Sequence, residues 1–231
     1  MPPSPAASSY CCSVSGVLVV EDIARITGTR IGNVYLVLLP GELLLIDTGM
    51  PGSAGRILAA IDGLGRDRHE LRTIVLTHWH PDHIGNAASL RRSTGARIAI
   101  HELDAPVLAG LERPAKGRRA MGVLMRVLGI RPIEPDLILL AGDRIGGLEV
   151  VHVPGHTAGS IALRRDDGVV VTGDALLGDR HGRVLDPDPS LSLDPARAAE
   201  SAAAIRALRP RLLLPGHGQP VRDPEPEPLT A

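Results

Sequence analysis

The chain has 231 residues, a net charge of −1 and a hydrophobic fraction of 44%, values typical of a globular protein with a sizeable core. The balanced charge gives no indication of a nucleic-acid partner, and no apolar run approaches the roughly 18 residues of a membrane span. The first 15 residues lack the charged and apolar segments of a signal peptide, so a cytoplasmic location is expected.

The first half of the chain alternates between short apolar runs and amphipathic stretches. Residues 1–15, rich in Pro, Ser and Ala, are expected to form a disordered lead. Strands are predicted at residues 17–20, 23–26, 33–39, 43–47, 73–77 and 97–100. Helices are predicted at residues 53–64, 82–94 and 102–111.

Residues 112–131 have a different character, because basic side chains stand beside Met, Val and Leu. This pattern predicts a helical insertion between core elements. Three interpretations are open: a surface helix that packs its apolar side on the body, a lid whose apolar face touches substrate, and a peripheral membrane contact.

The second half is rich in predicted strands, at residues 137–140, 148–153, 161–165, 168–172 and 211–214. A helix is predicted from Pro195 to Leu208, with Asp194 as its N-cap. Residues 223–231 are rich in Pro and Glu and are expected to form a loose tail. Since no linker or repeat interrupts residues 16–222, we expect them to form one domain.

The sequence Thr-His-Trp-His-Pro-Asp-His follows the strand predicted at residues 73–77. Alternate side chains of an extended backbone share a face, so His78 and His80 point the same way. Pro81 suits the first turn of a helix, which places Asp82 and His83 at its mouth, turned away from the first pair. This geometry predicts two adjacent sites for zinc or a similar divalent metal, the alternative being a polar turn at a strand end.

Three further candidate ligands, His156, Asp174 and His217, lie at strand ends or just after them. A glycine precedes each of them, which lets the backbone turn tightly and approach another group. Ligands carried on strand-end loops are typical of functional sites, although an isolated His or Asp in such a place is more often structural.

The motifs THWHPDH, GHTAGS, GD and GHG, in this order, resemble the metallo-β-lactamase superfamily, and especially its glyoxalase II-like and lactonase-like dinuclear members. The resemblance covers about residues 17–220 and implies an α/β protein with a four-layer αββα sandwich and a dinuclear site at one edge between two sheets. Carried over by position, the first metal would be held by His78, His80 and His156, and the second by Asp82, His83 and His217, with Asp174 bridging the two.

The resemblance also implies a reaction. A metal-bridging hydroxide would attack an ester, thioester or lactone carbonyl of a small-molecule substrate, with Asp82 and Asp174 as catalytic residues. The expected cofactors are two divalent ions, zinc first, with iron or manganese as alternatives. Asp47 would orient a ligating imidazole, the alternative being strand-end capping, and His181 is a candidate substrate contact. A homodimer is among the oligomeric states left open.

Departures from the family pattern keep the substrate open. The β-lactam-hydrolysing members generally lack an Asp at the position of Asp174, and the helical extension of glyoxalase II is missing after His217. The lactonases place a Tyr where this chain has Leu177. A persulfide dioxygenase-like oxidoreductase with one iron is the main alternative, and a non-catalytic metal-binding protein is another.

Overall fold

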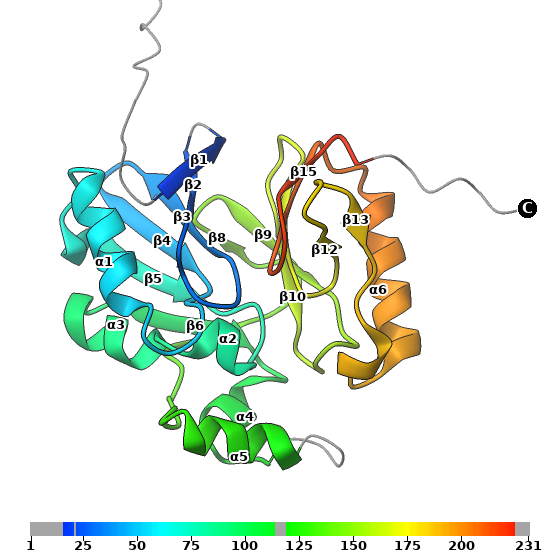
Figure 1. Ribbon diagram of the computed structural model, residues 1–231, viewed down its shortest axis with the longest axis horizontal. Helices are drawn as coiled ribbons and strands as arrows, with labels where there is room; N and C mark the ends of the chain where they lie inside the picture. Colours follow the sequence, from blue (N-terminus) through cyan, green and yellow to red (C-terminus); the bar gives the residue numbers. More distant parts are fainter. Residues whose placement is uncertain (1–15, 21, 114–118, 225–231) are drawn as a thin grey trace, which may run out of the picture.

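Two β-sheets lie side by side in the computed structural model, and helices cover the outer face of each sheet (Figure 1). The structure describes residues 16–20, 22–113 and 119–224, so the predicted lead at 1–15 and residues 225–231 of the predicted tail lie outside it. Within the described residues, no helix has the length and apolar character needed to cross a membrane.

The first sheet contains seven strands in chain order, antiparallel from β1 to β4 and parallel from β4 to β7. Its strands are β1 (Gly16–Val20), β2 (Ile23–Ile26), β3 (Val34–Leu39), β4 (Glu42–Ile46), β5 (Leu71–Val75), β6 (Arg97–His101) and β7 (Leu137–Leu139). The parallel strands direct their carboxyl ends to the same edge, where ligands of such sheets are usually found.

The second sheet has the order β15-β14-β11-β10-β9-β8, in which only β11 and β14 pair in parallel. Its strands are β8 (Arg144–Ile145), β9 (Leu148–His152), β10 (Ile161–Arg164), β11 (Val169–Gly173), β14 (Leu212–Pro215) and β15 (Val221–Arg222). A separate two-stranded ribbon is formed by β12 (Leu177–Gly178) and β13 (Val184–Leu185). Because β9, β11 and β14 run in one direction, the loops after them share an edge.

The helices are short, and most lie outside the sheets (Figure 1). They are α1 (Ala54–Gly63), α2 (Pro81–Ile84), α3 (Ala87–Thr94), α4 (Ala105–Leu108), α5 (Arg119–Val127) and α6 (Pro195–Ala207), with 3-10 turns η1 (Arg68–Glu70) and η2 (Pro189–Leu191). The Asp194 carboxylate accepts a hydrogen bond from Arg197 N at 3.0 Å, which confirms the predicted N-cap of α6.

Three apolar cores hold the layers together. Side chains of both sheets meet in the central core, which includes Tyr35, Ile46, Leu163 and Leu214. A second core joins the first sheet to α1 and α3, and a third joins the second sheet to α6. Burial of these side chains is the main stabilising contribution. The layers therefore follow the order helix, sheet, sheet, helix, and the predicted αββα sandwich is confirmed.

The predicted helix at residues 82–94 is wrong in one respect, because it is interrupted between α2 and α3. At Gly85 a Cβ atom would lie 2.5 Å from Pro51 Cδ and 2.6 Å from Gly49 O, so the backbone passes too close to a loop for a side chain. The Asn86 amide hydrogen-bonds that same loop, accepting from the amides of residues 52–54 and donating to the carbonyls of residues 48–50.

The helix predicted at 102–111 is also shorter than expected, since only α4 within it is helical. In the predicted insertion at 112–131, α5 is helical from Arg119 to Val127, and residues 114–118 lie outside the described part of the chain. On α5, Met121 and Met125 pack against the core that joins the first sheet to its helices.

Candidate metal centre

Seven candidate ligands from five segments meet where the two sheets end. Four follow β5: His78 and His80 in the loop, and Asp82 and His83 in α2. The other three lie on loops after strands of the second sheet, β9, β11 and β14, and they are His156, Asp174 and His217. The shared direction of those strands brings residues far apart in the chain to one edge.

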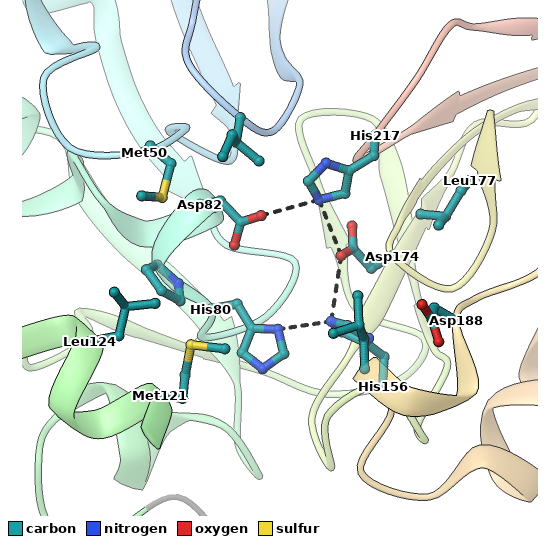
Figure 2. Close-up of a pocket in the computed structure, with 13 residues that line it drawn as sticks. Met50, His80, Asp82, Met121, Leu124, His156, Asp174, Leu177, Asp188 and His217 are labelled. Carbon is teal, nitrogen blue, oxygen red and sulfur yellow. Dashed lines mark hydrogen bonds and ion pairs between the residues drawn. The ribbon is translucent and has the colours of Figure 1, made fainter. Parts of the chain in front are cut away.

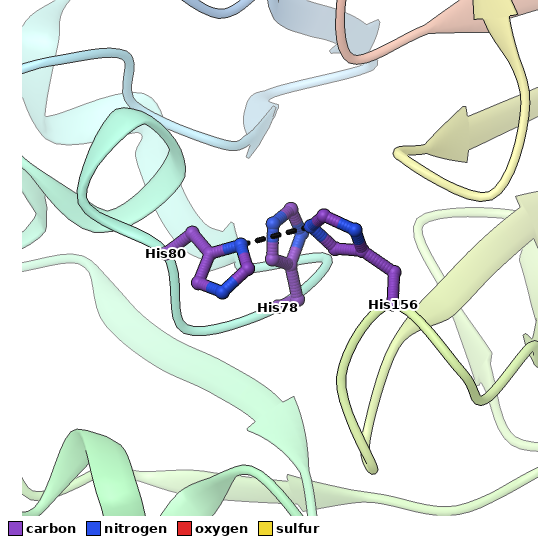
Figure 3. Close-up of side chains that lie close together, drawn as sticks. All are labelled: His78, His80 and His156. Atoms are coloured by element: carbon purple, nitrogen blue, oxygen red, sulfur yellow. Dashed lines mark hydrogen bonds between the residues drawn. The ribbon is translucent and has the colours of Figure 1, made fainter. Parts of the chain in front are cut away.

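The candidate ligand atoms form three overlapping groups, and within each group the atoms lie within 4.8 Å of one another. They are His78, His80 and His156; His78, His83 and Asp174; and Asp82, His83 and His217. In the first group, His80 Nδ1 and His156 Nε2 are 2.8 Å apart, and Figure 3 shows the two ring nitrogens facing each other beside His78. The residues that the sequence assigned to each half of a dinuclear site are therefore close together.

The Asp174 carboxylate lies between the two halves (Figure 2). Its Oδ2 is 3.5 Å from His156 Nε2 on one side and 3.3 Å from His217 Nε2 on the other. Its Oδ1 is 3.3 Å from His83 Nε2. Asp82 Oδ2 reaches His217 Nε2 at 3.2 Å. One carboxylate thus contacts imidazoles of both groups, as a bridging ligand would.

Three buried atoms at the centre have no hydrogen-bond partner among the described residues, and they are His78 Nε2, His83 Nε2 and Asp174 Oδ1. The 3.3 Å contact between the last two does not have hydrogen-bond geometry. Buried polar atoms are nearly always satisfied, because leaving one without a partner costs about 1–3 kcal/mol. Imidazole nitrogens and carboxylate oxygens are ligands that zinc and similar divalent ions accept, so the residues present fit such ions.

Burial keeps two imidazoles of the first group, those of His78 and His80, neutral. Burial lowers the pKa of His78 well below its usual range, and the neighbouring imidazoles of His83 and His156 lower it further. Burial and the imidazole of His156 lower the pKa of His80 to about 3. Each of these two rings therefore has one unprotonated nitrogen at neutral pH, the form that binds a metal.

The two carboxyl groups are ionised. Burial alone would raise the pKa of Asp174, but the imidazoles of His83 and His217 outweigh it and hold this pKa well below its usual range. Burial also acts to raise the pKa of Asp82, and the hydrogen bond from His217 and the charge of His83 lower it to about 2. The two carboxylates therefore contribute two negative charges, which suit divalent cations. Burial acts to lower the pKa of His217, but the carboxylates of Asp174 and Asp82 outweigh it and raise this pKa to about 9, so His217 would release a proton on binding a metal.

Asp47, at the end of β4, fixes the orientation of His83. Its Oδ2 is 2.8 Å from His83 Nδ1 and accepts a hydrogen bond from Thr77 Oγ1 at 2.8 Å, while its Oδ1 accepts one from Thr77 N at 2.8 Å. Burial acts to lower the pKa of His83, but the carboxylates of Asp174 and Asp47 outweigh it and raise this pKa well above its usual range. If a metal displaced the proton on Nε2, Asp47 would keep the one on Nδ1 and Nε2 would be the ligand atom. This arrangement, in which a carboxylate orients an imidazole, recurs around metal ligands.

A second buried carboxylate, that of Asp104 after β6, connects the two ligand loops, and no sequence pattern pointed to it. Its Oδ2 accepts hydrogen bonds from Thr157 Oγ1 at 2.7 Å and Trp79 N at 3.3 Å, and its Oδ1 accepts one from Gly159 N at 2.7 Å. Burial raises the pKa of Asp104 to about 6, against the lowering effect of these hydrogen bonds. Asp104 therefore holds the loop of His80 against the loop of His156.

A cavity of about 400 Å³ opens beside the centre (Figure 2). Five of the candidate ligands line it: His80, Asp82, His156, Asp174 and His217. The remaining wall is mostly apolar and includes two residues of α5, Met121 and Leu124. Helix α5 therefore packs on the body and also borders the cavity, and contact of this helix with substrate stays a prediction.

Other histidines are not brought to the centre. His181 is exposed on the loop between β12 and β13, where its Nε2 lies 2.9 Å from Arg180 Nε, and it does not line the cavity. The structure therefore gives no support to the predicted substrate contact. His101 and His152 stack on each other with ring centroids 4.3 Å apart, outside the three ligand groups.

Comparison with known proteins places this geometry in context. Residues 27–217 match the sequence model of a family described as "Metallo-beta-lactamase superfamily". The "Probable metallo-hydrolase YflN" of Bacillus subtilis (strain 168) is 32% identical over 217 residues, which cover 83% of this chain and 82% of that protein. A hydroxyacylglutathione hydrolase of Cereibacter sphaeroides is 35% identical over 156 residues, 65% of this chain, and the match spans 49% of that protein's length.

Solved structures share the fold. TTHA1623, determined in a di-iron-bound form, has a TM-score of 0.63 and 30% identity, covering 83% of this chain and 89% of that chain. BJP-1, a subclass B3 metallo-β-lactamase of Bradyrhizobium japonicum, has a TM-score of 0.66 at 23% identity, covering 87% of this chain and 77% of that chain, and this likeness concerns the fold alone.

Proposed function

Because the chain belongs to the metallo-β-lactamase superfamily, we propose that it is a dinuclear metallo-hydrolase that cleaves an ester, thioester or lactone carbonyl of a small molecule. The observation that carries this proposal is the set of three buried ligand atoms without hydrogen-bond partners, His78 Nε2, His83 Nε2 and Asp174 Oδ1, beside an open cavity. In the absence of metal, these atoms would be an uncompensated loss of stability.

The three groups of ligand atoms support a specific assignment of residues. His78, His80 and His156 would hold one ion, Asp82, His83 and His217 would hold the other, and Asp174 would contact both. Zinc is the metal we propose, since imidazole and carboxylate ligands suit it. The di-iron form of TTHA1623 makes iron the alternative.

Bound divalent ions would make water acidic enough to attack near neutral pH and would polarise the scissile carbonyl. The chain's own residues position the reactants and move the protons. Asp82 and Asp174 line the cavity with ionised carboxylates, so we assign to them the proton released from the attacking water. Asp47 keeps His83 in one orientation, and Asp104 keeps the loops of His80 and His156 together.

The named relatives support hydrolysis but leave the substrate open. YflN is described as a metallo-hydrolase, and the Cereibacter protein by its name hydrolyses a hydroxyacylglutathione. Because this chain matches about half of the latter protein, cleavage of that substrate remains a proposal to be tested. BJP-1 carries no argument for β-lactam hydrolysis at its level of identity.

Metal analysis joined to a substrate panel tests the proposal. Elemental mass spectrometry of the purified protein should find about two divalent ions per chain. The protein should hydrolyse a thioester or lactone in preference to a β-lactam or phosphodiester. A finding of one iron and no zinc per chain, with oxidation of a persulfide and no ester cleavage, would replace the hydrolase with a dioxygenase-like oxidoreductase.

A further inference from the structure

We infer that the cavity beside the metal centre binds an aliphatic acyl chain, so that the preferred substrates are neutral acyl esters, thioesters or lactones with a chain of several methylenes. The inference rests on the proposed hydrolase function and adds the class of substrate. It excludes a polar, anionic acyl donor as the preferred substrate.

The first observation is the position of the apolar side chains around the ligands. Figure 2 shows Met50, Met121 and Leu124 on one side of the ligands and Leu177 on the opposite side. Ile31 and Leu191 also line the cavity. A carbonyl carbon held at the ligands would therefore place its attached chain against apolar walls.

The second observation is the exposure of these walls. Ile31, Leu191 and Leu124 are 63%, 53% and 42% exposed, although all three border a concave surface. Single exposed apolar side chains are common, but a group of them around a cavity with a few polar atoms at its centre is typical of a ligand site. Covering them with an aliphatic chain would remove this surface from water.

The third observation is the charge of the lining. None of the described residues that line the cavity is Lys or Arg, and the one ionisable side chain outside the metal centre is Asp188. Asp188 Oδ1 accepts hydrogen bonds from Ser190 N at 2.8 Å and Ser190 Oγ at 2.7 Å, and these bonds lower its pKa, so the group is ionised. Among the described residues of the wall, an anionic substrate chain would meet a carboxylate and no basic side chain.

The wall contributed by α5 is held in place by the body of the protein. Met121 and Met125 pack against the core of the first sheet, which positions Leu124 at the cavity. On the same helix, Val127 is 78% exposed and does not line the cavity. A substitution of Leu124 therefore changes the cavity wall, and a matched substitution of Val127 changes only the solvent-exposed side of α5.

A chain-length series on the metal-loaded protein tests the inference. For acetyl, butyryl, hexanoyl and octanoyl thioesters, kcat/KM should rise about threefold to fourfold per added methylene until the chain fills the cavity. A flat series, or a preference for a glutathione thioester over a neutral thioester of the same acyl group, would overturn the inference.

Two variants distinguish an effect on the cavity wall from a general effect on folding. Leu124→Gln should lower kcat/KM for the octanoyl substrate about tenfold and change the acetyl value less than about twofold, because only the long chain reaches the wall. Val127→Gln should leave both values unchanged. Equal losses on both substrates in Leu124→Gln would contradict the inference.

A binding measurement makes the result independent of turnover. Calorimetric titration with methyl ketones of increasing length should show tighter binding of 2-decanone than of 2-butanone, and Leu124→Gln should reduce this difference. If no carbonyl compound is hydrolysed while long ketones still bind, the proposed reaction fails and the chain site stands. If long ketones bind no better than short ones, the chain site fails.

Discussion

Asp174 contacts more of the candidate ligands than a hydrogen-bonding role would require. Its two oxygens lie between 3.3 and 3.5 Å from His83, His156 and His217, and one of the oxygens is buried without a partner. Direct hydrogen bonding within the protein therefore does not satisfy this carboxylate. Two divalent ions shared through Asp174 would satisfy it and the unpaired imidazole nitrogens together.

His217 is the ligand whose removal should disturb the fold least, since its side chain is 29% exposed and follows the short strand β14. We expect His217→Ala to retain about one ion per chain and to lose at least about a hundredfold in kcat, because one of two ions loses a ligand. Elemental analysis and steady-state kinetics measure the two effects, with circular dichroism as the control for folding. Full activity with two ions retained would contradict the assignment of His217.

Asp104 should give stability an unusual dependence on pH. The carboxyl titrates near its ordinary value of 3.8 in the unfolded chain and at about 6 in the folded one. Between these values the folded state binds more protons, so this group's contribution lowers the free energy of unfolding as pH rises, by about 3 kcal/mol in all.

Asp104→Asn removes that titration. Urea titrations should therefore show that the free energy of unfolding of the wild type, minus that of the variant, decreases as the pH rises from about 4 to about 6. Asp62→Asn is the contrast, because the exposed Arg68 lowers the pKa of Asp62 and the effect of its titration has the opposite sign. Parallel curves for wild type and Asp104→Asn would contradict the inferred shift.

At the scale of elements, the break between α2 and α3 connects the ligand segment to the loop after β4. The Asn86 amide makes three hydrogen bonds through each of its two polar atoms, and Asn86 N donates to Thr48 Oγ1 at 3.0 Å. Its oxygen accepts from Ala54 N, the first amide of α1, which has no partner within that helix, and from the amides of the two residues before it. One side chain thus positions α1, α2 and the loop that carries Asp47.

Replacing Asn86 should therefore cost more than an ordinary polar substitution. We expect Asn86→Ala to lower the free energy of unfolding by about 3 kcal/mol, since it leaves several buried amides and carbonyls without partners. Ser89→Ala is the matched control, because the Ser89 hydroxyl makes a single hydrogen bond, to Asn86 O at 2.9 Å, and should cost about 1 kcal/mol or less. Denaturant titration compares the two, and equal losses would contradict the role of Asn86.

The elements also show what a sequence can and cannot reveal. The strand β5 and the cluster of candidate ligands after it were predictable, because apolar runs and the spacing of His78 and His80 are local signals. The resemblance of the motif order to a known family implied the αββα layers. The cavity wall was not predictable from the sequence, because its apolar residues share no spacing and meet only through tertiary packing. They include Ile31, Leu124, Leu177 and Leu191. Asp104 and Asn86 lay inside predicted helices, where their long-range hydrogen bonds leave no local pattern.

At the scale of the whole molecule, the candidate centre lies at the junction of the two sheets. Ions bound there would stabilise the folded chain, because the unfolded chain offers no such site. Removing zinc with EDTA should lower the free energy of unfolding by about 4 kcal/mol when free zinc had been near a thousand times the dissociation constant. Calorimetry with and without EDTA measures the shift, and an unchanged melting temperature would contradict a metal centre.

The composition of the three ligand groups has a consequence for biosynthesis. Each group combines residues that follow β5 with one that follows a strand of the second sheet. Among the described residues, none of the three groups is formed by residues 78–83 alone, although four donors lie there. Each proposed set would be complete only when the loop after β9, β11 or β14 has reached the donors of residues 78–83. Selection between metals by a complete set would then follow the geometry of the folded protein, in which the two sheets fix the distances between the ligands.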